Sequence, residues 1–151
     1  MAKYLRFHLE GATARARLME DLAPETCAAV WRALPVTGPC GHVLLAGTSC
    51  AVALDPAIVV PEENATGLIH TGDVLFIHYN ARERHGFPAA ESKVYWAYDR
   101  YCMPRTPGKM TPEFPNVFAQ FEGDTAAFFD ACRRTFTEGR RPLTLTGEEE
   151  Q

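Results

Sequence analysis

The sequence predicts a mainly β fold, a closed antiparallel barrel with two capping α-helices. Most of the chain consists of short stretches in which apolar and polar residues alternate, the pattern of strands with one buried face. Only residues 24–34 and 124–138 show the apolar spacing of an amphipathic helix. A length of 151 residues favours one domain with a substantial core. We expect that domain to span residues 1–147 and the acidic tail, residues 148–151, to fray.

The chain opens with a predicted hairpin over residues 3–9 and 13–19, turned at Gly11. The first helix begins at Pro24, since a proline at the first helical position loses no hydrogen bond. It ends before Pro35. Its apolar residues fall at i, i+3, i+4 and i+7 and are expected to seal one end of the barrel: Cys27, Val30, Trp31 and Leu34.

The middle of the chain alternates between strands and long loops. Residues 37–41 are rich in glycine and proline and predict a loop. A second hairpin is predicted from residues 42–46 and 49–54. The strongest strand signal is VLFIHY at residues 74–79, which is dense in β-branched and aromatic residues. A polar loop then leads to a further strand at residues 93–99.

The last third begins with residues 101–115, whose four prolines allow neither a helix nor a central strand. A strand is predicted at residues 116–121. Asp124 is expected to cap the second helix, Gly139 to end it, and residues 140–146 to form the closing strand. The buried side of this helix is predicted to carry Phe128, Phe129, Cys132 and Phe136.

Composition excludes several classes of partner. The net charge is −4 and no basic stripe is present, so nucleic acid is not an expected partner. No apolar run approaches the length of a membrane span, and the N-terminus lacks a signal core. Five cysteines at irregular spacing indicate free thiols in a reducing compartment. We therefore expect a cytoplasmic protein, and leave assembly into a homo-oligomer open.

Both ends of the chain resemble the cyclophilins. Residues 15–34, which end in LMEDLAPETCAAVWRAL, resemble the strand and first helix of that family. Residues 116–123, NVFAQFEG, resemble its strand before the second helix, and residues 140–146 its final strand. Cyclophilins carry their catalytic arginine in an F-H-R segment that a Q-G-G stretch follows. The nearest counterpart, residues 40–45 (CGHVLL), has no arginine.

The middle of the chain is similar to small bacterial cyclophilin-like barrels of unknown function. These share a G-D-[IV] turn into an aromatic strand, which corresponds to Gly72-Asp73-Val74 and to residues 94–98. Their wider relatives include barrel domains in allophanate-hydrolase and oxoprolinase-type subunits, which act on small amides and lactams. The resemblance therefore implies a cyclophilin-like barrel and a small amide or carboxylate ligand.

A ligand cleft is predicted where polar loops meet the middle strands. Glu62 and Glu63 share one loop, and His78 ends a strand. If His78 lies beside either carboxylate, the pair could act as general base and orienting group. Arginines could clamp a carboxylate through two parallel hydrogen bonds, and tyrosines could line the pocket. The predicted ligand-binding residues are Asn64, Tyr79, Arg82, Arg84, Tyr95, Tyr98, Arg100 and Tyr101.

The functional prediction is binding, and conversion, of a small polar metabolite with amide or carboxylate groups by cofactor-free acid–base chemistry. One alternative is a non-catalytic module within an oligomer or an amide-processing assembly. Another is prolyl isomerisation, for which an arginine from a different loop would have to reach the site. Neither a metal nor a cofactor is predicted, because no zinc-type spacing joins the available ligands. Those ligands are Cys40, His42, His70, His78 and His85.

Overall fold

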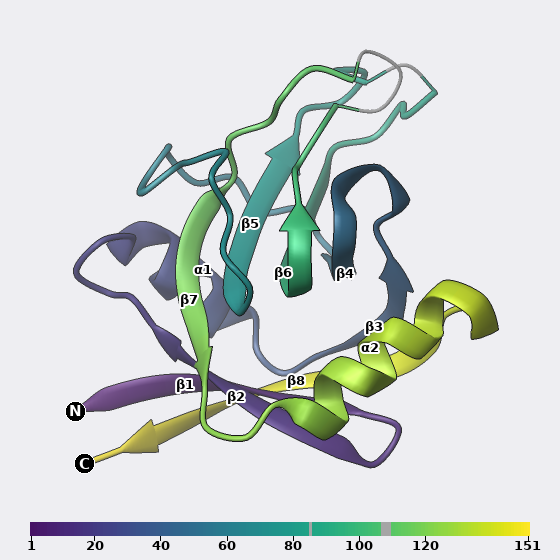
Figure 1. The fold of residues 1–151 in the computed structure, drawn as a ribbon. Helices are drawn as coiled ribbons and strands as arrows, with labels where there is room; N and C mark the ends of the chain where they lie inside the picture. Colours follow the sequence, from purple (N-terminus) through teal and green to yellow (C-terminus); the bar gives the residue numbers. More distant parts are fainter. Residues whose placement is uncertain (85, 107–109) are drawn as a thin grey trace.

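Eight strands close into one antiparallel barrel in the computed structural model, which describes residues 1–84, 86–106 and 110–151 and, for Leu44, the backbone alone. Neighbouring strands follow the order β1-β2-β7-β5-β6-β4-β3-β8 (Figure 1). This confirms the predicted mainly β, closed antiparallel barrel. The strands are β1 (Ala2–Leu9), β2 (Ala12–Leu18), β3 (Val36–His42), β4 (Gly47–Leu54), β5 (Asp73–Tyr79), β6 (Glu91–Cys102), β7 (Asn116–Glu122) and β8 (Arg141–Glu150).

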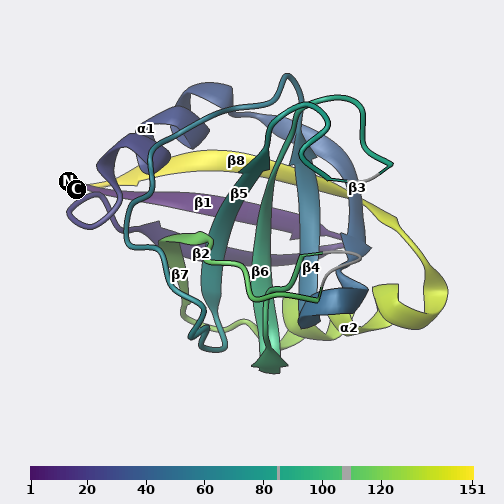
Figure 2. The same ribbon diagram turned by 90° about the horizontal axis from the view of Figure 1, so that it is seen from above.

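The two α-helices of the described residues are α1 (Pro24–Ala33) and α2 (Ala126–Glu138), and a single 3-10 turn, η1, spans Leu44–Ala46. The helices lie on opposite sides of the barrel (Figure 2). Among the residues that the structure describes, no helix is long and apolar enough to cross a membrane.

The barrel interior is filled from alternate strand positions, as the hairpin pattern predicted. Leu5, Phe7 and Leu9 of β1 are fully buried. The ring of Phe7 meets Trp96 edge-on, with 5.0 Å between centroids, and lies 5.6 Å from Phe128 of α2. Helix α2 therefore contributes an aromatic ring to the core that the strands enclose.

The buried face of α2 differs in part from the prediction. Phe128 and Cys132 are fully buried, but Phe136 is 60% exposed. The prediction for Phe136 was wrong because the buried stripe continues through Thr135 instead.

The ends of α2 are close to those predicted. The helix begins at Ala126, and the Asp124 carboxylate accepts a hydrogen bond from the Ala126 N–H at 3.1 Å. Gly139 ends the helix at φ +88°, and its N–H donates to the Thr135 carbonyl.

Residues 37–41 belong to β3 and not to the predicted loop. Thr37 pairs with Thr144 and Pro39 with Pro142 of β8. The glycines and proline are only local signals, and the barrel needs a strand here to close between β8 and β4. Tertiary pairing therefore overrides the local loop propensity.

The second hairpin also differs from its prediction. His42 ends β3, and the Val43 N–H already donates to the Ser49 carbonyl of β4. Residues 43–46 therefore connect the two strands and include η1, where the sequence predicted that the strand would continue to residue 46.

The acidic tail is ordered as far as Glu150, and the predicted fraying of residues 148–150 was wrong. In the β1–β8 ladder Glu148 pairs with Tyr4 and Glu150 pairs with Ala2. The Arg15 guanidinium also contacts Glu150, with an N–O distance of 2.6 Å. Backbone pairing and this ion pair hold the two chain ends side by side (Figure 1, Figure 2).

Helix α1 approaches β8 closely through the ring of Trp31. A Cβ atom built on Gly147 would lie 2.8 Å from Cη2 of Trp31 and 3.1 Å from Cδ1 of Leu34. Only glycine lets the ring rest on the strand without displacement.

We expect Gly147→Ala to lower the free energy of unfolding by about 1–3 kcal/mol, the usual cost of overpacking. Gly38→Ala is the matched control, because a Cβ there would meet Val52 at an ordinary 3.4 Å. Urea denaturation of both variants measures the difference. Equal stability of the two variants would contradict the close approach of Trp31.

Candidate functional site

A cavity of about 250 Å³ lies on the outer face of β5 and β6. On β5, Val74 and Phe76 face the barrel core, so Ile77 and Tyr79 face outward. On β6, Lys93 and Tyr95 share that outer face. Loop residues complete the wall of this hollow, which we call the β5–β6 cavity: Val43, Leu45, Ala46, Arg84, Pro104, Arg105 and Glu113, together with His42 at the end of β3.

Strand register explains why the cavity lies over Lys93. Lys93 pairs with Ile77 of β5 on one side and with Ala53 of β4 on the other. The small side chain of Ala53 leaves space beside the lysine. A second hollow of about 250 Å³ opens there and shares Tyr79, Arg84 and Lys93 with the first.

Arg84 is a buried arginine at the wall between the two hollows. It is 8% exposed, and its guanidinium stacks 3.8 Å from the Tyr79 ring centroid and 4.1 Å from that of Phe87. One terminal nitrogen binds the Glu91 carboxylate. Its Nε atom is buried and has no hydrogen-bond partner among the described residues. A buried donor without a partner is costly, so this N–H has capacity for a further acceptor.

Lys93 is a half-buried lysine that forms no ion pair or hydrogen bond within the described ranges. Its ammonium lies 5.9 Å from the Tyr95 ring centroid. Burial lowers the pKa of Lys93 below its usual value, and the positive charge of Arg84 lowers it further, against the opposing charges of Glu113 and Glu91. The lysine is therefore easier to deprotonate than an exposed one.

Tyr79 and Glu113 form the polar wall of the cavity. The Tyr79 hydroxyl donates to the Glu113 carboxylate. Burial, and then this hydrogen bond, raise the pKa of Tyr79 well above its usual value, and burial does the same for Tyr95. Both phenols are thus neutral at pH 7 and can donate hydrogen bonds.

The charges around the β5–β6 cavity are unequal. Three cationic side chains line it, those of Arg84, Lys93 and Arg105, with Glu113 as the only carboxylate in its described wall. Glu91 reaches Arg84 from the neighbouring hollow. The arrangement can therefore accept an anionic group.

The structure brings together three of the predicted site residues, Tyr79, Arg84 and Tyr95. His78 does not join them, because it follows Phe76 on the inward-facing row of β5. Adjacent residues on a strand point to opposite faces, so His78 and Tyr79 cannot share one cavity.

Tyr98 is likewise directed to the barrel interior. It is buried in the main core, where its hydroxyl lies 2.6 Å from Nε2 of His42. Arg100 and Tyr101 lie exposed at the end of β6, and Arg82 is exposed in the preceding loop. None of the three lines the β5–β6 cavity.

Glu63 has a structural role at the N-terminus of α1. Its carboxylate accepts hydrogen bonds from the Glu25 N–H at 3.0 Å, the Thr26 N–H at 2.9 Å and the Thr26 hydroxyl at 2.7 Å. Asn64 donates to the Val117 carbonyl of β7. Glu62 is exposed, and neither it nor Glu63 is hydrogen-bonded to His78 among the described residues.

The predicted ligand-binding residues did not include Lys93, Arg105 or Glu113. Lys93 could have been found, because it lies two residues before Tyr95 and so on the same strand face. Arg105 and Glu113 come from the proline-rich loop, where no local pattern indicates which strand the loop will cover.

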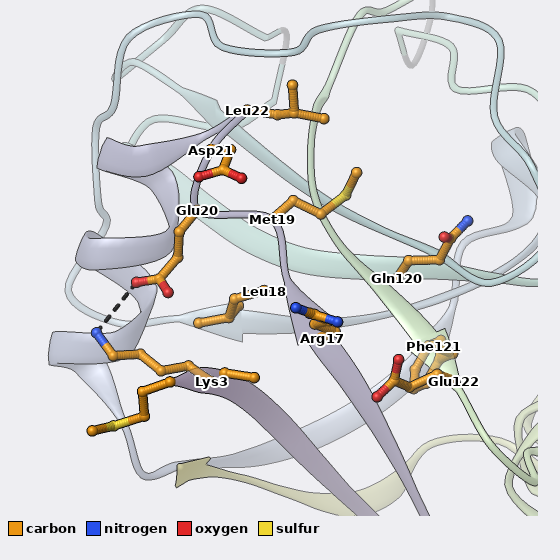
Figure 3. Close-up of a pocket in the computed structure, with 12 residues that line it drawn as sticks. Lys3, Arg17, Leu18, Met19, Glu20, Asp21, Leu22, Gln120, Phe121 and Glu122 are labelled. Carbon is orange, nitrogen blue, oxygen red and sulfur yellow. Dashed lines mark hydrogen bonds and ion pairs between the residues drawn. The ribbon is translucent and has the colours of Figure 1, made fainter. Parts of the chain in front are cut away.

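Another hollow, of about 470 Å³, lies between the N-terminus, the end of β2 and β7. Figure 3 shows its lining, with Lys3 paired to Glu20 at 3.2 Å. Arg17 and Asp21 are also exposed. Its charged side chains are thus solvated or paired, which makes it a weaker candidate for a specific site than the β5–β6 cavity.

The cysteines and the potential metal ligands of the described residues were also compared with the requirements of thiol and metal sites. All five cysteines are free and buried. Burial raises the pKa of Cys27 to about 12 and that of Cys102 to about 11, which makes both poor nucleophiles. No group of three histidine, cysteine or acidic side chains in the described ranges could hold a metal ion. His85 lies outside them.

Comparison with known proteins places the chain in a family. Residues 5–147 match the model for the protein of unknown function family DUF3830, and the chain belongs to that family. A comparison with curated protein sequences finds no match.

Solved structures show the same fold at low identity. The hypothetical protein AF2241 from Archaeoglobus fulgidus has a TM-score of 0.58 at 19% identity, over 96% of this chain and 94% of that one. McbB in complex with tryptophan has a TM-score of 0.68 at 14% identity, over 99% of this chain but only 45% of McbB. The Mimivirus cyclophilin has a TM-score of 0.53 at 12% identity, over 96% and 86%. The resemblance to cyclophilin-like barrels is confirmed.

We expect Glu63→Ala to destabilise the protein by about 1–2 kcal/mol, because the first turn of α1 loses its acceptor. Glu62→Ala is the control, since Glu62 is exposed and should change little. Burial alone would raise the pKa of Glu63, but its hydrogen bonds outweigh this and lower it from 4.5. The contribution is therefore complete above pH 4.5 and is lost as pH falls through the depressed pKa.

Thermal unfolding of the wild type and both variants between pH 7 and pH 3 measures this dependence. The gap between wild type and Glu63→Ala should narrow at acidic pH. A gap that is constant with pH would mean that the carboxylate does not cap the helix.

Proposed function

We propose that the protein binds a small metabolite with a carboxylate group in the β5–β6 cavity. The observation that carries this proposal is the buried Arg84, whose Nε N–H has no partner among the described residues. A carboxylate oxygen is the acceptor that a guanidinium binds best. Lys93 shares both hollows with Arg84 and adds a second positive charge.

The size of the cavity favours a small ligand. Its volume of about 250 Å³ lies near the lower end of the range of ligand pockets. The apolar part of its wall, including Ile77 and Pro104, suits a short hydrocarbon portion. The similar barrel of McbB was solved with tryptophan, which also carries a carboxylate, although that likeness extends to the fold alone.

The proposal includes conversion of the ligand by acid–base chemistry without a cofactor. Glu113 accepts a hydrogen bond from the Tyr79 hydroxyl, and its carboxylate can take up and return a proton at the cavity wall. This replaces the predicted pairing of His78 with Glu62 or Glu63, whose side chains are not hydrogen-bonded to each other among the described residues.

We expect short carboxylic acids to raise the melting temperature and their primary amides not to, because a neutral amide gains little from two cations. Arg84→Met should abolish the shift. Arg17→Ala, in the hollow of Figure 3, is the matched control and should retain it. A thermal-shift panel of acid–amide pairs tests this, with calorimetry on the best acid. Equal shifts by acids and amides, or loss of the shift in Arg17→Ala alone, would overturn the site.

Prolyl isomerisation is a second candidate, favoured by one observation. Arg84 and Arg105 share the cavity with Val43, which lies in the segment that corresponds to the cyclophilin arginine motif. A guanidinium near the prolyl nitrogen is what that reaction needs. Isomerisation of a proline-containing peptide, measured with the wild type and Arg105→Ala, distinguishes the two functions. Equal rates with and without wild-type protein would remove this candidate.

A further inference from the structure

We infer that Lys93 is a nucleophilic amine that forms an imine with a short 2-oxo acid whose carboxylate is held by Arg84. This inference rests on the proposed carboxylate site and names its ligand class. Both side chains line both hollows on the outer face of β5 and β6. A 2-oxo acid has its carbonyl carbon bonded directly to the carboxylate, so one small molecule can meet both groups.

Lys93 is held on a rigid part of the barrel. It lies near the start of β6 and is paired on both sides, with Ala53 of β4 and with Ile77 of β5. A strand bonded on both sides positions its side chains more precisely than a loop does. The backbone that carries the amine is therefore fixed relative to the cavity wall.

The groups that face Lys93 make its ammonium easier to deprotonate than that of an exposed lysine. Arg84 and Arg105 are the cations of the cavity wall, and Glu113 is its carboxylate, already engaged by Tyr79. Glu91, beyond Arg84, is engaged by that arginine, and Asp55 lines the neighbouring hollow that Lys93 shares. The other titratable side chains of the cavity wall are those of His42, Tyr79 and Tyr95. No carboxylate forms an ion pair with Lys93 in the described part of the chain. Burial therefore lowers its pKa, and the neutral amine needed for attack is more abundant than for an exposed lysine.

The reaction balances without a further reagent. The amine lone pair attacks the carbonyl carbon, a C–N bond forms, and the π pair of the carbonyl moves to the oxygen. The Glu113 carboxylate takes one proton from the nitrogen and passes it to this oxygen, which gives a neutral carbinolamine. The C–O bond then breaks as the C=N bond forms, and the remaining N–H proton passes through Glu113 to the departing hydroxide, which leaves as water. Amine and oxo acid thus give imine and water.

Reductive trapping with pyruvate and cyanoborohydride tests the inference. We expect one reduced adduct per chain by intact mass, located by peptide mapping at Lys93. Lys93→Arg should lose the adduct, and Lys3→Arg, the control in the hollow of Figure 3, should keep it. Acetone, a carbonyl compound without a carboxylate, should give far less adduct than pyruvate. Trapping should increase with pH and level off below the pH at which an exposed lysine would.

The results distinguish failure of the imine hypothesis from failure of the proposed carboxylate site. If pyruvate raises the melting temperature through Arg84 but leaves Lys93 unmodified, the imine is overturned and the carboxylate site stands. If pyruvate neither binds nor reacts while other acids bind, the ligand class is wrong. Adducts spread equally over Lys3, Lys93 and the N-terminus would also overturn the inference that Lys93 is the nucleophile. A melting curve of Lys93→Arg confirms that loss of the adduct does not come from unfolding.

Discussion

Continuous strand pairing around a closed barrel is the constraint on which the rest of this structure depends. Each strand is bonded on both sides, so its side chains must alternate between a closed interior and an outer face. The interior is occupied by the rings of Phe7, Trp96 and Phe128, which link the strands to α2. The proposed ligand would therefore bind outside the barrel, under the loops that cover its outer face.

The outer face of β5 and β6 carries positively charged side chains that are partly or fully removed from water. Arg84 is buried and Lys93 half-buried, and burying charge with incomplete pairing costs stability. Stacking on Tyr79 and Phe87 and the contact with Glu91 compensate part of this cost for Arg84. A bound carboxylate would offset more of it, which is the trade between stability and function that binding sites commonly show.

The chain belongs to DUF3830 and has a cyclophilin-like fold, but the shared fold does not imply the activity of a cyclophilin. The barrel is shared with the Mimivirus cyclophilin, yet the segment at residues 40–45 has no arginine. Arg84 and Arg105 come from later loops and line the β5–β6 cavity together with Val43 of that segment. Function on a shared fold resides in such side chains and not in the fold itself.

The sequence by itself determined the elements whose pattern is local. The alternation through Leu5, Phe7 and Leu9 defines β1 and its buried face, and apolar spacing defines both helices. It also indicated part of the cavity, because Arg84 and Tyr95 were predicted site residues. These predictions succeeded because hydrophobic periodicity depends only on near neighbours in the chain.

Only the tertiary structure decided which of these parts meet. β3 is a strand despite its glycines because its backbone pairs with β4 on one side and β8 on the other. Glu63 became a cap for α1, 38 residues away in sequence, and Glu113 reached Tyr79 from the proline-rich loop. Contacts of this kind depend on barrel closure, which brings together segments that no local pattern connects.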